Sequence, residues 1–273
     1  MEIDLFWHIL RTTSGYQSPR KSRFLVENLP GWATCIYYVR LLSIILKESM
    51  AAKKGHYDSR TWAKGSLSVI RLVESVGGKF QVSGLRGMNG QKGPFVYIAN
   101  HMSLLDTFVL PCILVAFGQV TFVVKEGLLK LPVFGVIMRA VHPIAVSRRN
   151  PREDLKVVLT EGQELLSRGC SVIIFPQATR SDKFDVASFN SLGVKLARKA
   201  GVPVVPVALK TDFQQNGKII KDIGRINPGK TLYLKFGEPM AVESSGQATH
   251  QKVVEFITQN LKSWGGEVHL NIP

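Results

Sequence analysis

Residues 95–117 read FVYIANHMSLLDTFVLPCILVAF. The first five residues, Phe95–Ala99, form a short apolar run that predicts a buried strand, and helical spacing follows over 104–117. The apolar stretch 107–124 is interrupted by Pro111 and by the Gly118-Gln119 pair. A buried helix, a turn and a second buried strand therefore explain this stretch better than a transmembrane helix does.

The same alternation of short apolar runs and helical patterns continues to the C-terminus. It predicts an α/β domain in which helices flank a mostly parallel sheet. The expected strands are Phe95–Ala99, Thr121–Val124, Pro143–Val146, Ser171–Phe175, Val204–Leu209 and Leu232–Phe236, and the expected helices lie near 104–117, 153–168, 188–200 and 247–263. The stretch Gly84–Gly93, rich in Gly, Gln and Asn, is the natural boundary between an N-terminal segment, 1–83, and the α/β domain, 84–273.

Two further helical patterns precede that boundary, near 33–50 and 60–77. A helix over 33–50 is about 27 Å long, which is marginal for crossing roughly 30 Å of hydrocarbon, and Arg40 in its middle is costly in a lone span. Three lysines lie at or beyond its end, Lys47, Lys53 and Lys54. The two helices are therefore expected to lie in one leaflet, with apolar faces in lipid and cations at the phosphates. The alternative is an ordinary helical hairpin packed on a core.

The composition is basic. The chain of 273 residues carries 35 Lys plus Arg against 20 Asp plus Glu, and residues 1–150 alone hold 19 basic and 8 acidic side chains, a net of +11. Such an excess indicates nucleic acid, an anionic membrane or a phosphorylated ligand, without choosing among them. The 45% of hydrophobic residues excludes a disordered chain, and three widely spaced cysteines predict neither a disulfide framework nor a thiolate zinc site.

The first candidate for chemistry directly follows the strand Phe95–Ala99. It reads Asn100-His101-Met102-Ser103-Leu104-Leu105-Asp106. A histidine can act as a general base near neutral pH, and Asp106, one turn into the helix, can face back and orient the imidazole. The alternative is structural, because Ser-x-x-Asp is also a capping pattern at a helix start.

The second candidate is the segment Phe175-Pro176-Gln177-Ala178-Thr179-Arg180-Ser181, which also follows a strand. Ligands of α/β proteins bind at the carboxyl ends of parallel strands, and hydroxyl and guanidinium donors suit a phosphate. Two other strands are followed by cations, Lys125 and the pair Arg148-Arg149. A solvated turn with one stray arginine explains this repeated pattern poorly. The remaining histidines are scattered and predict no metal site.

Taken in order, these motifs resemble those of the glycerolipid acyltransferases, and most closely the bacterial 1-acylglycerol-3-phosphate acyltransferase type. The resemblance covers roughly residues 90–240. It is carried by Asn-His-x4-Asp (100–106), Lys125 with Leu131-Pro132 and Gly135, Val146-Ser147-Arg148, Phe-Pro-Gln-Ala-Thr-Arg-Ser (175–181) and Val-Pro-Val-Val-Pro-Val (202–207).

The resemblance implies an α/β fold like that of glycerol-3-phosphate acyltransferase, and the helical patterns near 33–50 and 60–77 predict a two-helix membrane-associating motif before it. It implies that His101, oriented by Asp106, deprotonates the free sn-2 hydroxyl of a 1-acylglycerol 3-phosphate. The hydroxyl then attacks the thioester of acyl-CoA or acyl-carrier protein and gives phosphatidic acid for phospholipid biosynthesis. The implied phosphate-binding residues are Lys125, Arg148, Thr179 and Arg180, and the implied supporting residues are Asn100, Gln177 and Ser181. No cofactor or metal is implied beyond the acyl donor, and the chain has no Gly-x-Ser-x-Gly elbow for an acyl-serine route.

One departure from the family pattern concerns the acceptor. The family usually has Glu-Gly where this chain has Gln177-Ala178, so the segment keeps hydrogen-bonding capacity but loses a charge. Two alternatives therefore stay open: an acyltransferase with another acceptor, such as glycerol 3-phosphate or another lysolipid, and a catalytically silent module that binds anionic lipid. The expected partners are anionic membrane lipids, a lysophospholipid acceptor and the acyl donor, but not nucleic acid. The expected location is monotopic or peripheral, on the cytoplasmic face of the bacterial inner membrane.

Overall fold

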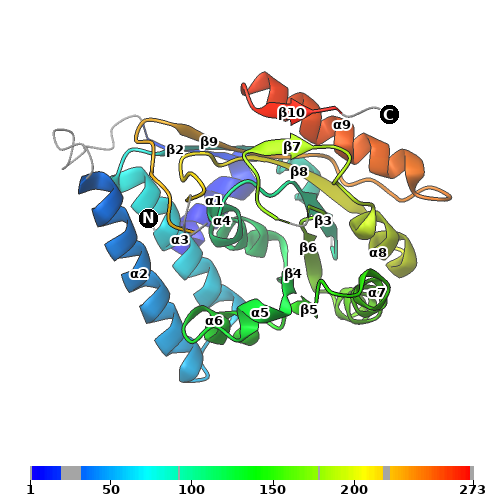
Figure 1. Cartoon of the computed structure of the whole chain (residues 1–273), viewed down its shortest axis with the longest axis horizontal. Coiled ribbons are helices and arrows are strands. Elements are labelled where there is room, and N and C mark those ends of the chain that lie inside the picture. Colours follow the sequence, from blue (N-terminus) through cyan, green and yellow to red (C-terminus); the bar gives the residue numbers. More distant parts are fainter. Residues whose placement is uncertain (1, 20–31, 92, 178, 218–221, 271–273) are drawn as a thin grey trace.

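The computed structural model describes residues 2–19, 32–91, 93–177, 179–217 and 222–270. Within these residues eight strands form one sheet (Figure 1). In order across the sheet, the strands are β1 (Tyr16–Gln17), β2 (Lys79–Ser83), β9 (Thr231–Phe236), β8 (Val204–Lys210), β3 (Val96–Ala99), β6 (Ser171–Ile174), β4 (Val120–Lys125) and β5 (Ile144–Val146). All pairs from β8 through β3, β6 and β4 to β5 are parallel. Antiparallel pairing occurs between β1 and β2 and between β8 and β9. The predicted α/β fold with a mostly parallel sheet is confirmed.

The central strands are buried on both faces because helices cover both faces. Every residue of β3 and of β6 is buried, as expected of parallel strands in an α/β domain. Along β3, Tyr97 packs into the hydrophobic cluster on one side of the sheet, whereas Val96 and Ile98 pack into the cluster on the other side. Residues of α1 (Ile3–Thr13), α2 (Trp32–Lys53), α3 (Ser59–Ser75) and α4 (Leu105–Leu114) join the first cluster, and residues of α7 (Pro151–Ser167), α8 (Leu192–Ala200) and α9 (Gln247–Ser263) join the second (Figure 1).

The apolar stretch 107–124 folds as predicted. Helix α4 is followed by a short 3-10 turn, Val115–Phe117, and then by β4. Gly118 lies between them with a φ of 146°, a backbone conformation that residues other than glycine rarely adopt. No helix in the described part of the chain is long and apolar enough to cross a membrane.

The two predicted N-terminal helices are present as α2 and α3, but they are buried to different extents. Helix α3 packs closely on α4 and buries nine residues, whereas α2 buries Tyr37, Leu41 and Ser49. Strand β2, which ends at Ser83, lies inside the sheet between β1 and β9. The division into segments 1–83 and 84–273 stays a prediction, and elements from both sides of it share one sheet and one core.

Several elements were not anticipated from the sequence. They are α1, β1, β2, α5 (Glu126–Leu129), α6 (Phe134–Ala140) and the parallel pair of β7 (Lys183–Asp185) with β10 (Glu267–His269). Among these elements, helix α1 packs on the core with one full side. It buries Ile3, Phe6 and Leu10, and Trp7 Nε1 donates a 2.9 Å hydrogen bond to the carbonyl of Cys112 in α4.

Replacing Leu10 with alanine should destabilise the whole fold. Leu10 is 0% exposed in the core cluster, so Leu10→Ala removes buried methyl groups and leaves a cavity, at a cost of about 2–5 kcal/mol in the free energy of unfolding. Urea denaturation measures this cost. Leu5→Ala on the same helix is the matched control, because Leu5 is 53% exposed and the change should have little effect. Equal stability of the two variants would contradict the docking of α1 on the core.

Candidate active site

The parallel strands bring the candidate residues to one edge of the sheet. β3, β6, β4, β5 and β8 all run in the same direction, so their carboxyl ends lie together. His101 follows β3, Lys125 ends β4, Arg148 follows β5, and the segment 175–181 follows β6. The expectation of cationic and histidine-bearing strand ends at one edge is therefore met by the topology.

His101 and Asp106 are in direct contact. His101 Nδ1 lies 2.9 Å from Asp106 Oδ2, and the Asp106 side chain is fully buried. The same oxygen accepts the backbone N–H groups of Met102, at 2.6 Å, and Ser103, at 3.0 Å. One carboxylate therefore serves both roles that the sequence left open, capping the start of α4 and contacting the imidazole. With Nδ1 engaged by Asp106, Nε2 is the ring nitrogen placed to take up a proton.

The segment after β6 holds the backbone of His101 from both sides. The His101 N–H donates to Gln177 Oε1 at 2.7 Å, and the Ser181 N–H donates to the His101 carbonyl at 3.0 Å. The imidazole also stacks on the ring of Phe175, with centroids 4.1 Å apart and planes 17° apart. Gln177 is buried, and Ala178 lies outside the described residues. Backbone and ring of His101 are thus both fixed before any ligand binds.

The Asn100 side chain bridges the end of β3 and strand β8. Its side-chain amide donates to the Leu209 carbonyl at 2.8 Å, and its side-chain oxygen accepts the Leu209 N–H at 2.8 Å. These bonds continue the pairing of β3 with β8 past the last residue of β3. They fix the direction in which the chain leaves the strand toward His101.

A cavity of about 400 Å³ opens beside His101. All four predicted phosphate-binding residues line it together with the histidine: Lys125, Arg148, Thr179 and Arg180. The rest of the lining is mostly apolar and comes from α2, α4, β4, α5, α6 and the turns beside them: Ile45, Leu104, Phe108, Phe122, Val124, Leu128, Leu131, Phe134 and Met138. The cavity is therefore amphipathic, because cationic and apolar side chains line it together with a general-base candidate.

Acidic side chains contact Arg180 and the loop that carries Arg148. Arg180, whose side chain is 17% exposed, forms an ion pair with Asp222, which also lines the cavity. The Asp154 carboxylate accepts the backbone N–H groups of Ser147, at 2.8 Å, and Arg148, at 2.7 Å, and so fixes the loop after β5. Burial lowers the pKa of the Arg148 guanidinium, and the charge of Asp154 opposes this, yet an arginine keeps its charge at neutral pH.

Sequence reasoning did not predict the apolar lining of the cavity or the ion-pair partner of Arg180. Leu104 and Leu131 lie within quoted motifs, but their place in the cavity was not predicted, and Asp222 lies in a loop without a recognisable pattern. Thr211, directly after β8, was also missed, although its hydroxyl contacts Asp106. The position of Thr211 after a strand of the same edge was the one available signal.

Comparison with known proteins finds acyltransferases. The acyltransferase family model matches residues 79–210. A 1-acyl-sn-glycerol-3-phosphate acyltransferase of Pseudomonas aeruginosa is 28% identical over 213 residues, covering 78% of this chain and 77% of that protein. A chloroplast 1-acyl-sn-glycerol-3-phosphate acyltransferase of Arabidopsis thaliana is 31% identical over 166 residues, covering 61% of this chain but only 44% of the plant protein.

The fold has a counterpart among solved structures. The crystal structure of the 1-acyl-sn-glycerophosphate acyltransferase PlsC from Thermotoga maritima superposes with a TM-score of 0.61 at 23% sequence identity. The match covers 86% of this chain and 95% of the other. The resemblance to acyltransferases that the motifs indicated is confirmed by the family model and the relatives, and the fold is confirmed by this structure.

The contact of Gln177 with His101 leads to a prediction on stability. Gln177→Leu should lower the free energy of unfolding by about 1–3 kcal/mol, because the His101 N–H, which faces the buried side chain of Gln177, then loses its acceptor. Gln177→Glu keeps an acceptor oxygen at the same place and should cost less. Urea denaturation of both variants tests this, and a leucine variant as stable as wild type would show that the bond contributes nothing.

Proposed function

From the match of residues 79–210 to the acyltransferase family model, we propose that the chain transfers a fatty acyl group from an acyl thioester to the free sn-2 hydroxyl of a 1-acylglycerol 3-phosphate, giving phosphatidic acid. The observation that carries this proposal is that one cavity is lined by His101, by cationic side chains and by apolar side chains. A lysophosphatidate has the matching parts: a phosphate, a hydroxyl and an acyl chain.

In the proposed mechanism His101 is the general base. Its Nε2 accepts the proton of the acceptor hydroxyl while that oxygen attacks the carbonyl carbon of the thioester. The Asp106 carboxylate, 2.9 Å from Nδ1, stabilises the imidazolium that forms. Collapse of the tetrahedral intermediate breaks the C–S bond, and the imidazolium returns its proton to the departing thiolate. Because a thioester is already activated, a base and correct positioning suffice, without a covalent acyl-enzyme.

The cationic side chains of the cavity are proposed to hold the acceptor's phosphate. Lys125, Arg148 and Arg180 supply charge, and the hydroxyl of Thr179 supplies a further donor. Gln177 is absent from the described residues that line the cavity, because its amide faces the backbone of His101. We therefore infer that the change from Glu to Gln in this segment acts on the support of His101 and leaves the acceptor preference unchanged. The predicted acyl donor is either acyl-CoA or acyl-carrier protein.

We also propose that helix α2 holds the protein on an anionic membrane surface. Its outer side carries an apolar stripe at helical spacing, each residue at least 42% exposed: Trp32, Val39, Leu42, Leu46 and Met50. Lys47, Lys53 and Lys54 lie on the same helix or just beyond it and suit the lipid phosphates. Exposed Leu128 and Leu131 line the cavity, to which α2 contributes Ile45. A lysolipid in the leaflet then has a short apolar path to His101, and the cytoplasmic face of a bacterial inner membrane remains the expected location.

Turnover assays test the proposed reaction. Purified protein is given lysophosphatidate, glycerol 3-phosphate or lysophosphatidylcholine, each with acyl-CoA and with acyl-carrier protein, and lysophosphatidate should be the preferred acceptor. His101→Ala should lower kcat by about 100-fold or more, because it removes the general base. His8→Ala is the matched control, since His8 is exposed on α1.

Three outcomes of these assays would count against the proposal. Equal turnover by His101→Ala and wild type would remove the general-base assignment. A preference for another acceptor, unchanged by Gln177→Glu, would identify a different lysolipid or glycerol 3-phosphate as substrate. No turnover with any pair would favour the catalytically silent lipid-binding module.

Vesicle binding tests the membrane surface separately from activity. The double variant Leu42→Glu/Leu46→Glu should weaken binding to phosphatidylglycerol-containing vesicles by roughly tenfold or more, because it places two charges in the apolar stripe. Leu270→Glu is the control, since Leu270 is 48% exposed and lies beyond β10, away from α2. Reversal of Lys47, Lys53 and Lys54 should weaken binding most at low salt. Unchanged sedimentation of both α2 variants would contradict this orientation.

A further inference from the structure

The buried threonine at the end of β8 contacts the carboxylate behind His101. Thr211 is 0% exposed, and its hydroxyl lies 2.5 Å from Asp106 Oδ1. This is the oxygen that does not contact the imidazole, since His101 Nδ1 contacts Oδ2. The Thr211 hydroxyl is also 2.8 Å from Ser103 Oγ, and Ser103 Oγ accepts the Leu105 N–H at 3.2 Å.

The supply of donors fixes the direction of this chain of hydrogen bonds. An ionised carboxylate only accepts, so the Thr211 proton is directed at Asp106 Oδ1. Thr211 Oγ1 then accepts the Ser103 hydroxyl proton, and Ser103 Oγ accepts from the Leu105 backbone. On the other oxygen, the N–H groups of Met102 and Ser103 and the imidazole Nδ1 converge. Hydrogen bonds linked in this way polarise one another in the interior.

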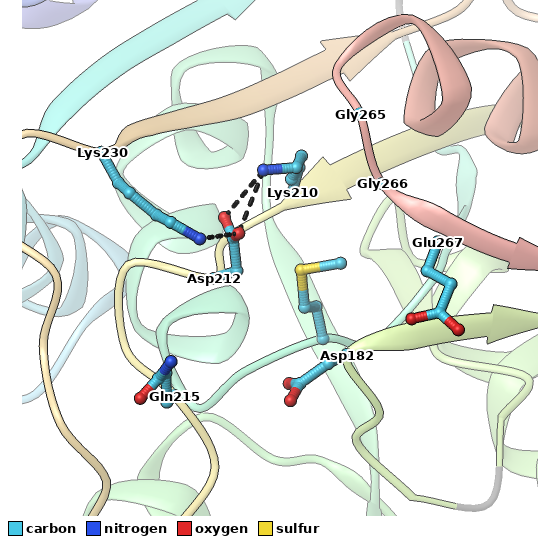
Figure 2. A pocket seen from close by; sticks show the side chains of 9 residues that line it. Asp182, Lys210, Asp212, Gln215, Lys230, Gly265, Gly266 and Glu267 are labelled. Carbon is cyan, nitrogen blue, oxygen red and sulfur yellow. Dashed lines mark hydrogen bonds and ion pairs between the residues drawn. The ribbon is translucent and has the colours of Figure 1, made fainter.

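The chain on either side of Thr211 is held in place, by an ion cluster around Asp212 and by hydrogen bonds of Leu209. Asp212 contacts Lys210, at 3.0 and 3.1 Å, and also Lys230, and both ammonium groups point at its carboxylate in Figure 2. Burial raises the pKa of Asp212, but the hydrogen bonds and charges of Lys230 and Lys210 outweigh this and lower it. On the other side, Leu209 is bonded twice to Asn100. The segment that presents Thr211 is therefore fixed to the strand that carries His101.

We propose that Thr211 is a positioning residue for catalysis: its hydroxyl locks the Asp106 carboxylate in the orientation that aligns His101. Without that hydroxyl, Asp106 Oδ1 loses its donor among the described residues. The carboxylate is then free to rotate toward the remaining donors and to weaken its contact with Nδ1. The catalytic part of this inference rests on the proposed acyl transfer.

Kinetics of two Thr211 variants test the inference. Thr211→Val keeps the shape but removes the hydroxyl, and it should lower kcat about 10- to 100-fold with KM for lysophosphatidate nearly unchanged. Thr211→Ser restores the hydroxyl and should keep kcat within about threefold of wild type. Thr121→Val is the matched control, because the buried Thr121 hydroxyl donates to the Val141 carbonyl in another part of the sheet.

A double variant separates positioning from a general loss of fold. In the Asp106→Asn background, Thr211→Val should cause no further loss of kcat, because its effect passes through Asp106. Additive losses would overturn the inference. So would a valine variant with wild-type kcat, or a serine variant as impaired as the valine variant. If circular dichroism shows Thr211→Val unfolded, Thr211→Cys takes its place, since a thiol is a weak donor, and the same outcomes apply.

A spectroscopic readout keeps this test independent of the reaction. The Nδ1–H of His101 should give a low-field proton resonance in protein labelled with ¹⁵N-histidine, assigned by its loss in His101→Gln. It should persist in Thr211→Ser and shift upfield or vanish in Thr211→Val. If the resonance shows these changes in a protein that has no turnover, the positioning role is supported and the proposed reaction is contradicted. An unaltered resonance in Thr211→Val would overturn the positioning role whatever the turnover.

Discussion

A carboxylate buried away from water must receive hydrogen bonds or lose its charge, and the centre of this protein is arranged around that requirement at Asp106. Its oxygens are met by two backbone N–H groups, one hydroxyl and one imidazole. These donors come from the turn after β3 and from the residue after β8. The hydrogen bonds that Asp106 accepts therefore fix the relative positions of two strand ends, and with them the orientation of His101.

Parallel pairing extends this arrangement to the rest of the site. Since β3, β4, β5, β6 and β8 share a direction, their carboxyl ends place His101, the cations and the segment after β6 at one edge. The segment after β6 holds His101 through Gln177 and Ser181, and it also contains Thr179 and Arg180, which are proposed to bind the phosphate. The proposed base and the proposed phosphate site are thus joined through a few residues of backbone rather than through separate loops.

Features that depend on residues close together in the sequence were mostly predicted, and features that depend on contacts between distant residues were mostly not. The strand from Phe95 and the helix over 247–263 carry strong local periodicity, and both were predicted within about a residue. His101 with Asp106 was also predictable, because the two residues are close in sequence. Thr211 and Asp222 were not, because their contacts with Asp106 and Arg180 join residues far apart in the chain. Strand β2 was missed for the same reason, since its partner is β9.

Helix α2 shows why the N-terminal segment is to be understood together with the active site. Its inner side contributes Ile45 to the cavity, and its Tyr38 hydroxyl exchanges hydrogen bonds with the backbone of Gly224, at 2.7 and 2.8 Å. Gly224 lies two residues from Asp222, the partner of Arg180. The outer side of the same helix carries the exposed apolar stripe. One helix thus links the surface proposed to meet lipid with the wall of the cavity and with the loop that carries the partner of Arg180. The proposed lipid substrate gives a physical reason for this link, because the helix proposed to meet the bilayer also lines the cavity beside His101.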